Sequence, residues 1–369
     1  MAFTQLQGSE ILLQPIAQAS PVNVYTEWDT LEEVIVGIID DFRIPEWDTN
    51  LKAVIPNATR QYFIDRSGKR FDADHVARAR KEVNGLAALL EGLGVTVRRP
   101  ELHDHFRPIV TPFFSTNGGY YSAMPRDGLF ALGQKIIETP MAWRSRYFET
   151  FPFRGILNDY FRRGAHITSA PKPMLKDTMW KVDHAFPEDH FEQVIEEHEP
   201  LFDAADFLRI GADIVGQRSH VTNRMGVQWL QRELGEQYKI HIYEFDDASP
   251  MHIDTTLMPL SPGRVLVNRA WVSKLPDFFK DWEVLVPPPS TIPDAHPLYM
   301  TSKWIHTNVL SLNDRTVIVE RQEEYLIAAF KRWGYEVVPC DFRNFQSFGG
   351  SFHCATLDVR RAGTYQRYS

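Results

Sequence analysis

Apolar and polar positions follow each other along the chain in a unit that recurs five times. The first unit begins with a short apolar run at 31–37 and then, after a polar connection, has a longer stretch at 74–93 whose apolar positions are three and four apart. A glycine then opens a second short apolar run at 94–97. The pattern predicts a strand, an amphipathic helix and a second strand in each unit.

Four similar units follow the first. Their predicted strand, helix and strand lie at 128–133, 144–163 and 165–168; at 212–216, 224–234 and 239–243; at 263–268, 275–281 and 282–286; and at 315–319, 323–333 and 334–338. Continuous Val and Ile runs of this kind indicate strands that are buried on both faces. Because one unit cannot bury its apolar surface alone, the units must pack on each other. A closed ring of five units and an ordinary doubly wound α/β sheet both satisfy the pattern.

No domain boundary interrupts the units. The proline run at 287–289 indicates a surface loop, because the repeat continues after it. Residues 1–20 stand outside the repeat and are predicted to form a flexible N-terminal arm. The sequence thus predicts one α/β domain over residues 21–369.

Composition narrows the class of protein. The chain has 369 residues with 40 Lys and Arg against 48 Asp and Glu, so the basic face of a nucleic-acid binder is not expected. No apolar run approaches the roughly 18 residues of a membrane span, and residues 1–19 lack the pattern of a secretory signal. Two cysteines are too few for a disulfide scaffold or a four-cysteine zinc site. These features predict a cytoplasmic protein that binds neither nucleic acid nor membrane.

The most distinctive local cluster lies at 349–356, where paired glycines precede Cys354. Glycine permits backbone conformations closed to other residues and the close approach of a ligand. A cysteine after such a loop is a candidate nucleophile if nearby charge favours its thiolate. Taken alone, a buried structural cysteine is the commoner explanation. That explanation holds more firmly for Cys340, which ends a predicted buried strand.

Three further clusters carry an imidazole or carboxylates. His252 and Asp254 would point to the same face if they lay in a strand. Asp203 and Asp206 are three apart among small residues, and Asp127 directly precedes a predicted strand. Singly, each has an ordinary explanation as a cap, a turn residue or a hydrogen-bonded structural group. Jointly, they fall near strand ends that would converge in a ring, and clustered carboxylates suit a cationic substrate such as a guanidinium.

A metal site is not predicted. His103 and His105 form an HxH pair, and His184 follows Asp183. An HxH pair in a polar loop is a weak signal, and no third ligand stands at a recognisable spacing.

Longer stretches resemble the glycine amidinotransferase family of guanidino-modifying enzymes. The matching stretches are YTEWDTLEEVIVG (25–37), IETPMAWR (137–144), APKP (170–173), FDAADF (202–207), MHID (251–254) and GGSFHCATLDVRR (349–361). The resemblance runs from about residue 21 to the C-terminus. It implies a five-bladed, pseudo-symmetric α/β propeller of ββαβ units, and therefore favours the ring over the doubly wound sheet. It also implies a homodimer without a metal or an organic cofactor.

The resemblance assigns roles to five residues. It implies that Cys354 attacks the guanidinium carbon of L-arginine and forms an amidino-thioether. His252 would protonate the leaving ornithine amine and later take a proton from the incoming amine, while Asp203 orients its ring. Asp127 and Asp254 would hold the guanidinium. Two half-reactions of this kind imply ping-pong kinetics, with L-arginine and a small amine acceptor as the partners.

The sequence departs from glycine-accepting members where they bind the substrate carboxylate. Those members have Asn-Pro-Asp-Arg where this chain reads Asn268-Arg269-Ala270-Trp271, which is two residues shorter. Arg269 is therefore the candidate for the carboxylate-binding arginine, acting from a shifted loop, unless that contact is lost. Thr301 and Ser302 match the family's hydroxyl pair near that carboxylate.

A second departure concerns the room at the site. Ser249 stands where glycine-accepting members have Asn, two residues before Met251, and its smaller side chain leaves more space. We therefore expect an acceptor bulkier than glycine, such as lysine or the amine precursor of a guanidine natural product. The stretches 252–260 and 350–361 are especially similar to family members of toxin biosynthesis.

Two alternative functions stay open. A hydrolase of the same superfamily, such as an arginine deiminase, would use the same thiol, imidazole and carboxylates but let water resolve the intermediate. It would release citrulline instead of ornithine. A non-catalytic binder of guanidinium metabolites would keep the scaffold without the chemistry. The family-specific stretches favour transfer, with glycine itself as the alternative acceptor.

Overall fold

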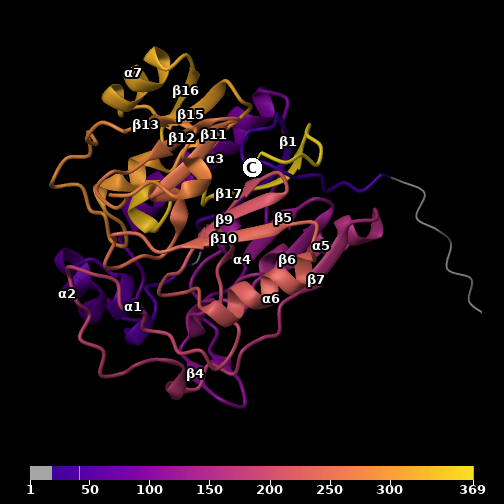
Figure 1. The fold of residues 1–369 in the computed structure, drawn as a ribbon. Coiled ribbons are helices and arrows are strands. Elements are labelled where there is room, and N and C mark those ends of the chain that lie inside the picture. Colours follow the sequence, from indigo (N-terminus) through magenta and orange to yellow (C-terminus); the bar gives the residue numbers. More distant parts are fainter. Residues whose placement is uncertain (1–18, 41, 369) are drawn as a thin grey trace, which may run out of the picture.

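The computed structural model describes residues 19–40 and 42–368 (Figure 1). Within these residues the strands form five three-stranded sheets and one two-stranded sheet. In each three-stranded sheet the central strand pairs antiparallel with one neighbour and parallel with the other. Most of the predicted arm at 1–20 lies outside the described residues, and Ser20, at its end, is buried.

The five sheets are built alike. They contain β17 (Thr356–Arg361), β1 (Leu31–Val36) and β2 (Thr96–Arg98); β5 (Leu129–Leu132), β6 (Lys135–Glu138) and β7 (His166–Ser169); β8 (Phe207–Ile210), β9 (Asp213–Gln217) and β10 (Lys239–Tyr243); β11 (Leu257–Ser261), β12 (Arg264–Val267) and β13 (Glu283–Leu285); and β14 (Leu310–Ser311), β15 (Thr316–Glu320) and β16 (Glu336–Cys340). The two-stranded sheet pairs β3 (Ile109–Val110) with β4 (Ser115–Thr116).

Each sheet contains one strand more than the predicted unit. In the last three sheets the added strand is β8, β11 or β14, which precedes the predicted first strand and pairs antiparallel with it. In the second sheet the predicted first strand is β5, an edge strand, and the central strand is β6. The first sheet takes its added strand, β17, from the C-terminal end of the chain. The two ends of the described chain are thereby joined in one sheet.

Burial separates the inner strands from the outer ones. Every residue of β5 and β9 is buried, so the prediction of strands covered on both faces is confirmed there, and the added strand β8 is buried as well. The outer parallel strands β7 and β10 contain no buried residue, and the prediction is wrong for them. Their apolar residues are half-exposed, although β5 and β8, which also pair on one side only, are fully buried.

Four helices connect a central strand to its parallel neighbour. They are α3 (Ala73–Gly92), α5 (Arg154–Arg162), α6 (Arg224–Leu234) and α7 (Glu324–Arg332), and Figure 1 places α7 beside β15 and β16, and α5 beside β6 and β7. The long helix predicted at 144–163 is interrupted: short 3₁₀ turns precede α5, and Pro152 lies in the second of them, where its missing N–H disfavours a continuous helix. The helix predicted at 275–281 is reduced to the 3₁₀ turn Asp277–Phe279 after Pro276.

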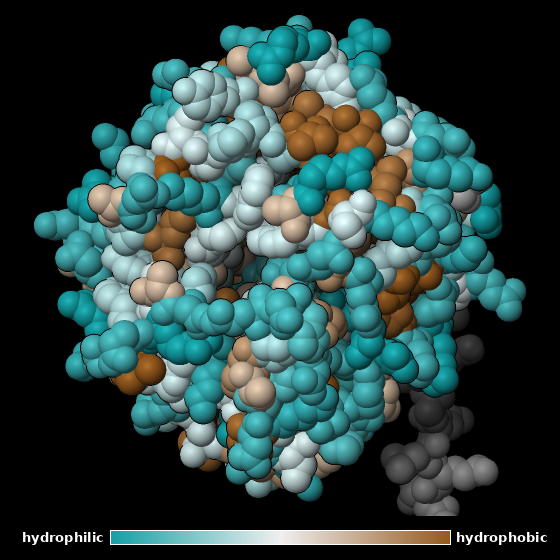
Figure 2. Space-filling model, turned by 60° about the vertical axis from the view of Figure 1, so that its left-hand side comes forward, coloured by the Kyte–Doolittle hydropathy of each residue, from teal (hydrophilic) through white to brown (hydrophobic). Residues whose placement is uncertain are grey.

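Three shorter helices were not predicted, and the first two lie in the connection within the first unit. They are α1 (Thr49–Val54), α2 (Asn57–Arg66) and α4 (Pro125–Gly128). Within the described ranges, no helix combines the length and the apolar character that a membrane crossing needs. The face drawn in Figure 2 is largely hydrophilic, with separate hydrophobic patches.

Candidate active site

The predicted site residues occupy the same place in different units, namely the short turn just before the first strand of a sheet. Asp127 lies in α4, before β5, and Asp203 begins the 3₁₀ turn η4 (Ala204–Asp206), before β8. His252 and Asp254 lie at the 3₁₀ turn η5 (Ile253–Thr255), before β11. Cys354 lies in the turn before β17. The expectation that His252 and Asp254 share the face of a strand is wrong, because Asp254 has already entered the helical turn.

The turns bring these five side chains together. One ligand-type atom from each of Asp127, His252 and Cys354 lies within 4.8 Å of the others. His252 Nε2 is 3.3 Å from Asp203 Oδ2, and its Nδ1 is 3.8 Å from Asp127 Oδ1. The thiol of Cys354 donates to Asp254 Oδ2 over 3.1 Å. All five side chains are buried or nearly so.

The surroundings of Cys354 favour its protonated form. Burial raises the pKa of the thiol well above its usual value, and the carboxylates of Asp254 and Asp127 raise it further. Asn308, which follows the turn η7 (Lys303–Thr307) before β14, donates from Nδ2 to the sulfur over 3.2 Å. Its Oδ1 accepts from the backbone N–H of Cys354 and of two residues just before it. The sequence analysis missed Asn308, and only the position of that turn could have indicated it.

His252 is set up to carry a proton. Burial lowers the pKa of its imidazole, but the charge of Asp127 and the hydrogen bond to Asp203 outweigh burial and raise the pKa to about 10. At neutral pH the ring is therefore an imidazolium that can act as a general acid.

Arg146 holds two of the carboxylates and was also missed. It lies in the 3₁₀ turn η1 (Arg144–Arg146), just beyond a matching stretch, and is almost fully buried. Its Nη2 donates to Asp127 Oδ2 over 2.8 Å, and its Nη1 is 3.5 Å from Asp203 Oδ2. Glu149 pairs with the same guanidinium, and burial raises the pKa of Glu149 to about 7.

The paired glycines are required by the path of the backbone at the thiol. Gly349 has φ +105°, which is in the region that favours glycine. A Cβ on Gly350 would lie 2.6 Å from Cys354 Cβ and 2.7 Å from the sulfur of Met124. The loop can therefore approach the cysteine only where no side chain intervenes.

A cavity of about 240 Å³ opens onto the thiol. Four predicted residues line it beside the reacting groups, namely Ser249, Met251, Thr301 and Ser302. Asp247 and Trp271 also line it and were not predicted. The cavity walls thus include the carboxylates of Asp247 and Asp254 but no lysine or arginine of the described chain.

Arg269 does not reach this cavity, contrary to expectation. It is exposed, and Asn268 holds the tight turn around it: its Oδ1 accepts from Ala270 N over 3.1 Å, and its backbone oxygen accepts from Trp271 N over 3.1 Å. The turn directs Trp271 to the cavity and leaves Arg269 in solvent.

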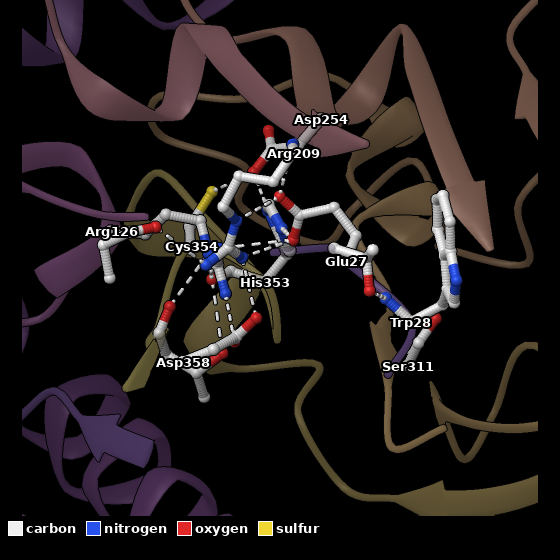
Figure 3. Close-up of polar contacts among 12 residues, drawn as sticks. Glu27, Trp28, Arg126, Arg209, Asp254, Ser311, His353, Cys354 and Asp358 are labelled. Carbon is white, nitrogen blue, oxygen red and sulfur yellow. Dashed lines mark hydrogen bonds and ion pairs between the residues drawn. The ribbon is translucent and has the colours of Figure 1, made fainter. Parts of the chain in front are cut away.

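Behind the site, buried charges form a network that the sequence analysis did not predict (Figure 3). Arg209 contacts Glu27 over 2.6 Å and Asp358 over 2.7 Å. Asp358 also accepts from Arg126 over 2.6 Å and from Arg361 over 2.7 Å. The three guanidinium groups hold the pKa of Asp358 well below its usual value despite its burial.

The remaining candidate groups are structural or separate from the site. Asp206 accepts from Ser219 Oγ over 2.6 Å and from Gln217 Nε2 over 2.9 Å, and burial raises its pKa to about 7. Among the described side chains, those close enough to share a metal ion are Asp127, His252 and Cys354, not the HxH pair at 103–105. That the site works without a metal stays a prediction.

Comparison with known proteins places the chain in a family. No protein-family model matches it. It is 50% identical over 360 residues to the L-arginine:L-lysine amidinotransferase of Pseudomonas savastanoi pv. phaseolicola, covering 96% of this chain and 99% of that one. It is 43% identical to the mitochondrial glycine amidinotransferase of Danio rerio, covering 98% and 88%. The structure of SxtG, an amidinotransferase from Microseira wollei in the saxitoxin biosynthetic pathway, superposes with a TM-score of 0.88 at 45% identity, covering 95% and 100%.

The fold, mixed α/β with small sheets, is that of the amidinotransferase structures. The chain belongs to the amidinotransferase family, and it is a transferase. The predicted family and class of enzyme are therefore confirmed.

Proposed function

We propose that this chain transfers the amidino group of L-arginine to a primary amine through a covalent intermediate on Cys354, and releases L-ornithine. The observation that carries the proposal is a cluster of a thiol, an imidazolium and unpartnered carboxylate oxygens, which the cavity reaches at Cys354, His252 and Asp254. Within the described chain, Oδ1 of Asp127 and Oδ1 of Asp254 are buried without a hydrogen-bond partner. A guanidinium, with five N–H donors in a plane, can satisfy both oxygens.

The first half-reaction loads the cysteine. A bound guanidinium adds positive charge beside the thiol and so favours loss of the thiol proton to the solvent in the cavity, while Asp254, which contacts the thiol, stays ionised. The thiolate attacks the guanidinium carbon, and His252 gives its proton to the departing nitrogen. The carbon–nitrogen bond breaks, ornithine leaves as an amine, and the amidino group stays on sulfur.

The second half-reaction unloads it. His252, now neutral, takes a proton from the entering ammonium group, and the free amine attacks the amidino carbon. The carbon–sulfur bond breaks, the new guanidine leaves, and a proton from the amine returns to the sulfur. Asp203, in contact with His252 Nε2, keeps the ring oriented through both steps. Two half-reactions at one site give ping-pong kinetics.

Incubation with arginine, in the presence and absence of an amine, tests this mechanism. With arginine and a suitable amine, we expect ornithine and a new guanidine in equal amounts, and parallel lines in double-reciprocal plots. Citrulline formed from arginine without any amine would instead identify a deiminase-like hydrolase.

We propose an acceptor bulkier than glycine that carries a second cationic group. Ornithine leaves from the cavity that the acceptor enters, so both must fit the same walls. Asp247 lines that cavity, is half-buried, and accepts from the backbone N–H of Ser249 through one oxygen. Its carboxylate can hold the distal ammonium group of lysine or of a diamine, and a relative at 50% identity is named for lysine.

An amine panel tests the acceptor. Lysine and diamines should be used with higher kcat/KM than glycine. Asp247→Asn should reduce kcat/KM for these acceptors about 10- to 100-fold, because it removes a charge-assisted hydrogen bond, with a much smaller effect on a monoamine of equal length. Glycine turned over far faster than every larger amine would contradict the proposal.

We also propose the setting in which the enzyme works. The five three-stranded sheets would be the blades of one propeller domain over residues 21–369, closed by the pairing of β1 with β17.

The pathway would be the biosynthesis of a guanidine natural product, such as a toxin, since a structural relative comes from the saxitoxin pathway. A cytoplasmic homodimer is expected, and sedimentation of the purified chain tests the dimer.

A further inference from the structure

His353 lies between two buried carboxylates, one on each side of its ring (Figure 3). Its Nδ1 is 2.8 Å from Asp254 Oδ2, and its Nε2 is 3.1 Å from Glu27 Oε2. The backbone fixes the ring from behind, because the backbone oxygen of His353 accepts from Arg126 Nε over 2.7 Å and its N–H donates to Asn308 Oδ1 over 3.1 Å. The ring is therefore held at both nitrogens and at both backbone polar groups.

The two contacts determine the charge of the ring. A neutral imidazole donates from one nitrogen and accepts at the other, whereas an imidazolium donates from both. Glu27 is bound by Arg209 over 2.6 and 2.7 Å and lies 3.5 Å from Arg126. These contacts and the hydrogen bond from His353 lower the pKa of Glu27 well below its usual value despite burial, so it is an ionised acceptor.

Asp254 is the second ionised acceptor. Burial raises the pKa of its carboxyl, but the hydrogen bond and the charge of His353 outweigh burial and lower it, with a further contribution from His252. Two ionised carboxylates facing the two nitrogens leave no acceptor role for the ring. Both nitrogens must donate.

We propose that His353 is a positioning residue, fixed as an imidazolium between Glu27 and Asp254, that keeps Asp254 ionised and its free oxygen available for the substrate guanidinium. This inference rests on the proposed function, in which Asp254 binds that guanidinium. His353 acts through Asp254, and the resemblance assigned it no role.

The site needs such a charge because the carboxylate of Asp254 and the ionised thiol would repel each other. Asp254 Oδ2 accepts from both His353 Nδ1 and the Cys354 thiol, which leaves Oδ1 unpartnered. When the thiol ionises, a thiolate and a carboxylate stand about 3 Å apart in a buried site, a costly arrangement without a compensating cation. The imidazolium of His353 supplies a fixed cation in contact with Asp254, beside the imidazolium of His252, and the substrate supplies a further one.

Two substitutions separate the charge of His353 from its hydrogen bonds. In His353→Asn the amide nitrogen can take the place of Nδ1 and still donate to Asp254, but it carries no charge. In His353→Gln the amide nitrogen takes the place of Nε2, toward Glu27, so the donor to Asp254 is also lost. His75→Asn is the matched control, because His75 is equally buried and its ring nitrogens contact only Tyr299 Oη and the backbone oxygen of Asn344.

The pH profile of kcat/KM for arginine reports the groups of the free enzyme. In both His353 variants the acidic limb should move up by about one to three pH units, because Asp254 loses its adjacent cation. The KM for arginine should rise about 10- to 100-fold, and more in His353→Gln than in His353→Asn. His252 and Cys354, which also face Asp254, are unchanged in these variants. His75→Asn should keep the acidic limb of the native pH profile, even if it lowers the melting temperature.

Nitrogen-15 NMR of histidine-labelled protein measures the charge directly. The His353 signal, assigned by its loss in His353→Asn, should show imidazolium shifts in both nitrogens at pH 7. Neutral-ring shifts at pH 7, or an acidic limb that stays in place while stability falls as in His75→Asn, would overturn the inference. Ornithine release by the native enzyme tests the proposed function separately, and the NMR result does not depend on turnover.

Discussion

At the scale of single residues, the proposed reaction depends on how Cys354 is surrounded. Burial and two carboxylates raise the pKa of the thiol, so the free enzyme keeps it protonated at neutral pH. His252 has the opposite bias, with a pKa raised to about 10 by Asp127 and Asp203 against the effect of burial. In the proposed mechanism, an arginine guanidinium that binds beside Cys354 favours its thiolate and leaves His252 protonated. The thiolate can then attack first, and His252 can protonate the departing nitrogen afterwards.

Replacing the thiol tests this assignment. Cys354→Ala should lower ornithine release about 10⁴-fold or more, because no other described side chain at the site can form the covalent bond. Arginine binding, measured by calorimetry, should persist, since the carboxylates remain. Cys340→Ala is the matched control and should keep near-native turnover, because Cys340 ends β16 away from the cavity. Normal ornithine release from Cys354→Ala would refute the covalent mechanism.

The loop before the thiol makes a second prediction. Gly350→Ala places a Cβ 2.6 Å from that of Cys354, so the cysteine must shift. Displacements of about 1 Å at a reacting group cost roughly 100-fold in rate, and kcat for ornithine release should fall by that order. Gly85→Ala, at a site with open space around its Cβ, should leave kcat unchanged. Equal kcat in both variants would show that the close approach has no consequence.

At the scale of elements, the sequence predicts long helices with a regular apolar period, but it does not predict very short strands and turns. The helix predicted at 74–93 is α3, whose buried Val83, Leu86 and Leu90 recur three and four apart. The added strand β14 has two residues, and no alternation can be recognised over that length. The turns that carry Asp203 and Asp254 are 3₁₀ segments of three residues, and they too lack a local signature.

The packing of α3 gives a stability prediction. Leu90 is fully buried, so Leu90→Ala should lower the free energy of unfolding by about 2 to 5 kcal/mol. Leu93, three residues on, is 49% exposed, and Leu93→Ala should change it by less than about 0.5 kcal/mol. Urea unfolding followed by circular dichroism measures both. Equal losses in the two variants would contradict the assigned face of the helix.

At the scale of the whole molecule, the buried charge network joins segments far apart in sequence. Glu27 and Arg209 are 182 residues apart, and Arg126 and Asp358 are 232 apart. A local pattern cannot predict such pairs, although the matching stretches contained Glu27 and Asp358. The resemblance supplied Asp127, Asp203, His252, Asp254 and Cys354, which the structure brings together. Arg269 lies in the stretch that departs from the family, and the structure leaves its side chain exposed and outside the cavity.

The network gives a prediction that depends on pH. Asp358→Asn leaves three buried guanidinium groups short of an acceptor charge and should cost about 3 to 5 kcal/mol of unfolding free energy at pH 7. Because the folded-state pKa of Asp358 is depressed, its contribution is present above the ordinary carboxyl pKa of about 4 and is lost as pH falls toward the depressed value. The gap between native and variant should therefore narrow below about pH 4.

A surface pair of the same sheet is the control for that substitution. Glu32 pairs with Arg360 over 2.8 Å, and both side chains are about 40% exposed. Glu32→Gln should cost less than about 1 kcal/mol at every pH. A gap for Asp358→Asn that widens in acid would contradict the sign assigned to its pKa.

The covalent intermediate is the central claim, and intact-protein mass spectrometry tests it most directly. The enzyme is mixed with arginine labelled in the guanidino carbon, without an acceptor amine, and quenched in acid. We predict a mass increase equal to one labelled amidino group, located on the peptide that contains Cys354, together with ornithine in the same amount, and disappearance of the adduct when an acceptor amine is added before the quench. Ornithine and guanidine product formed at normal rates without any adduct, or an adduct on another residue, would contradict the account.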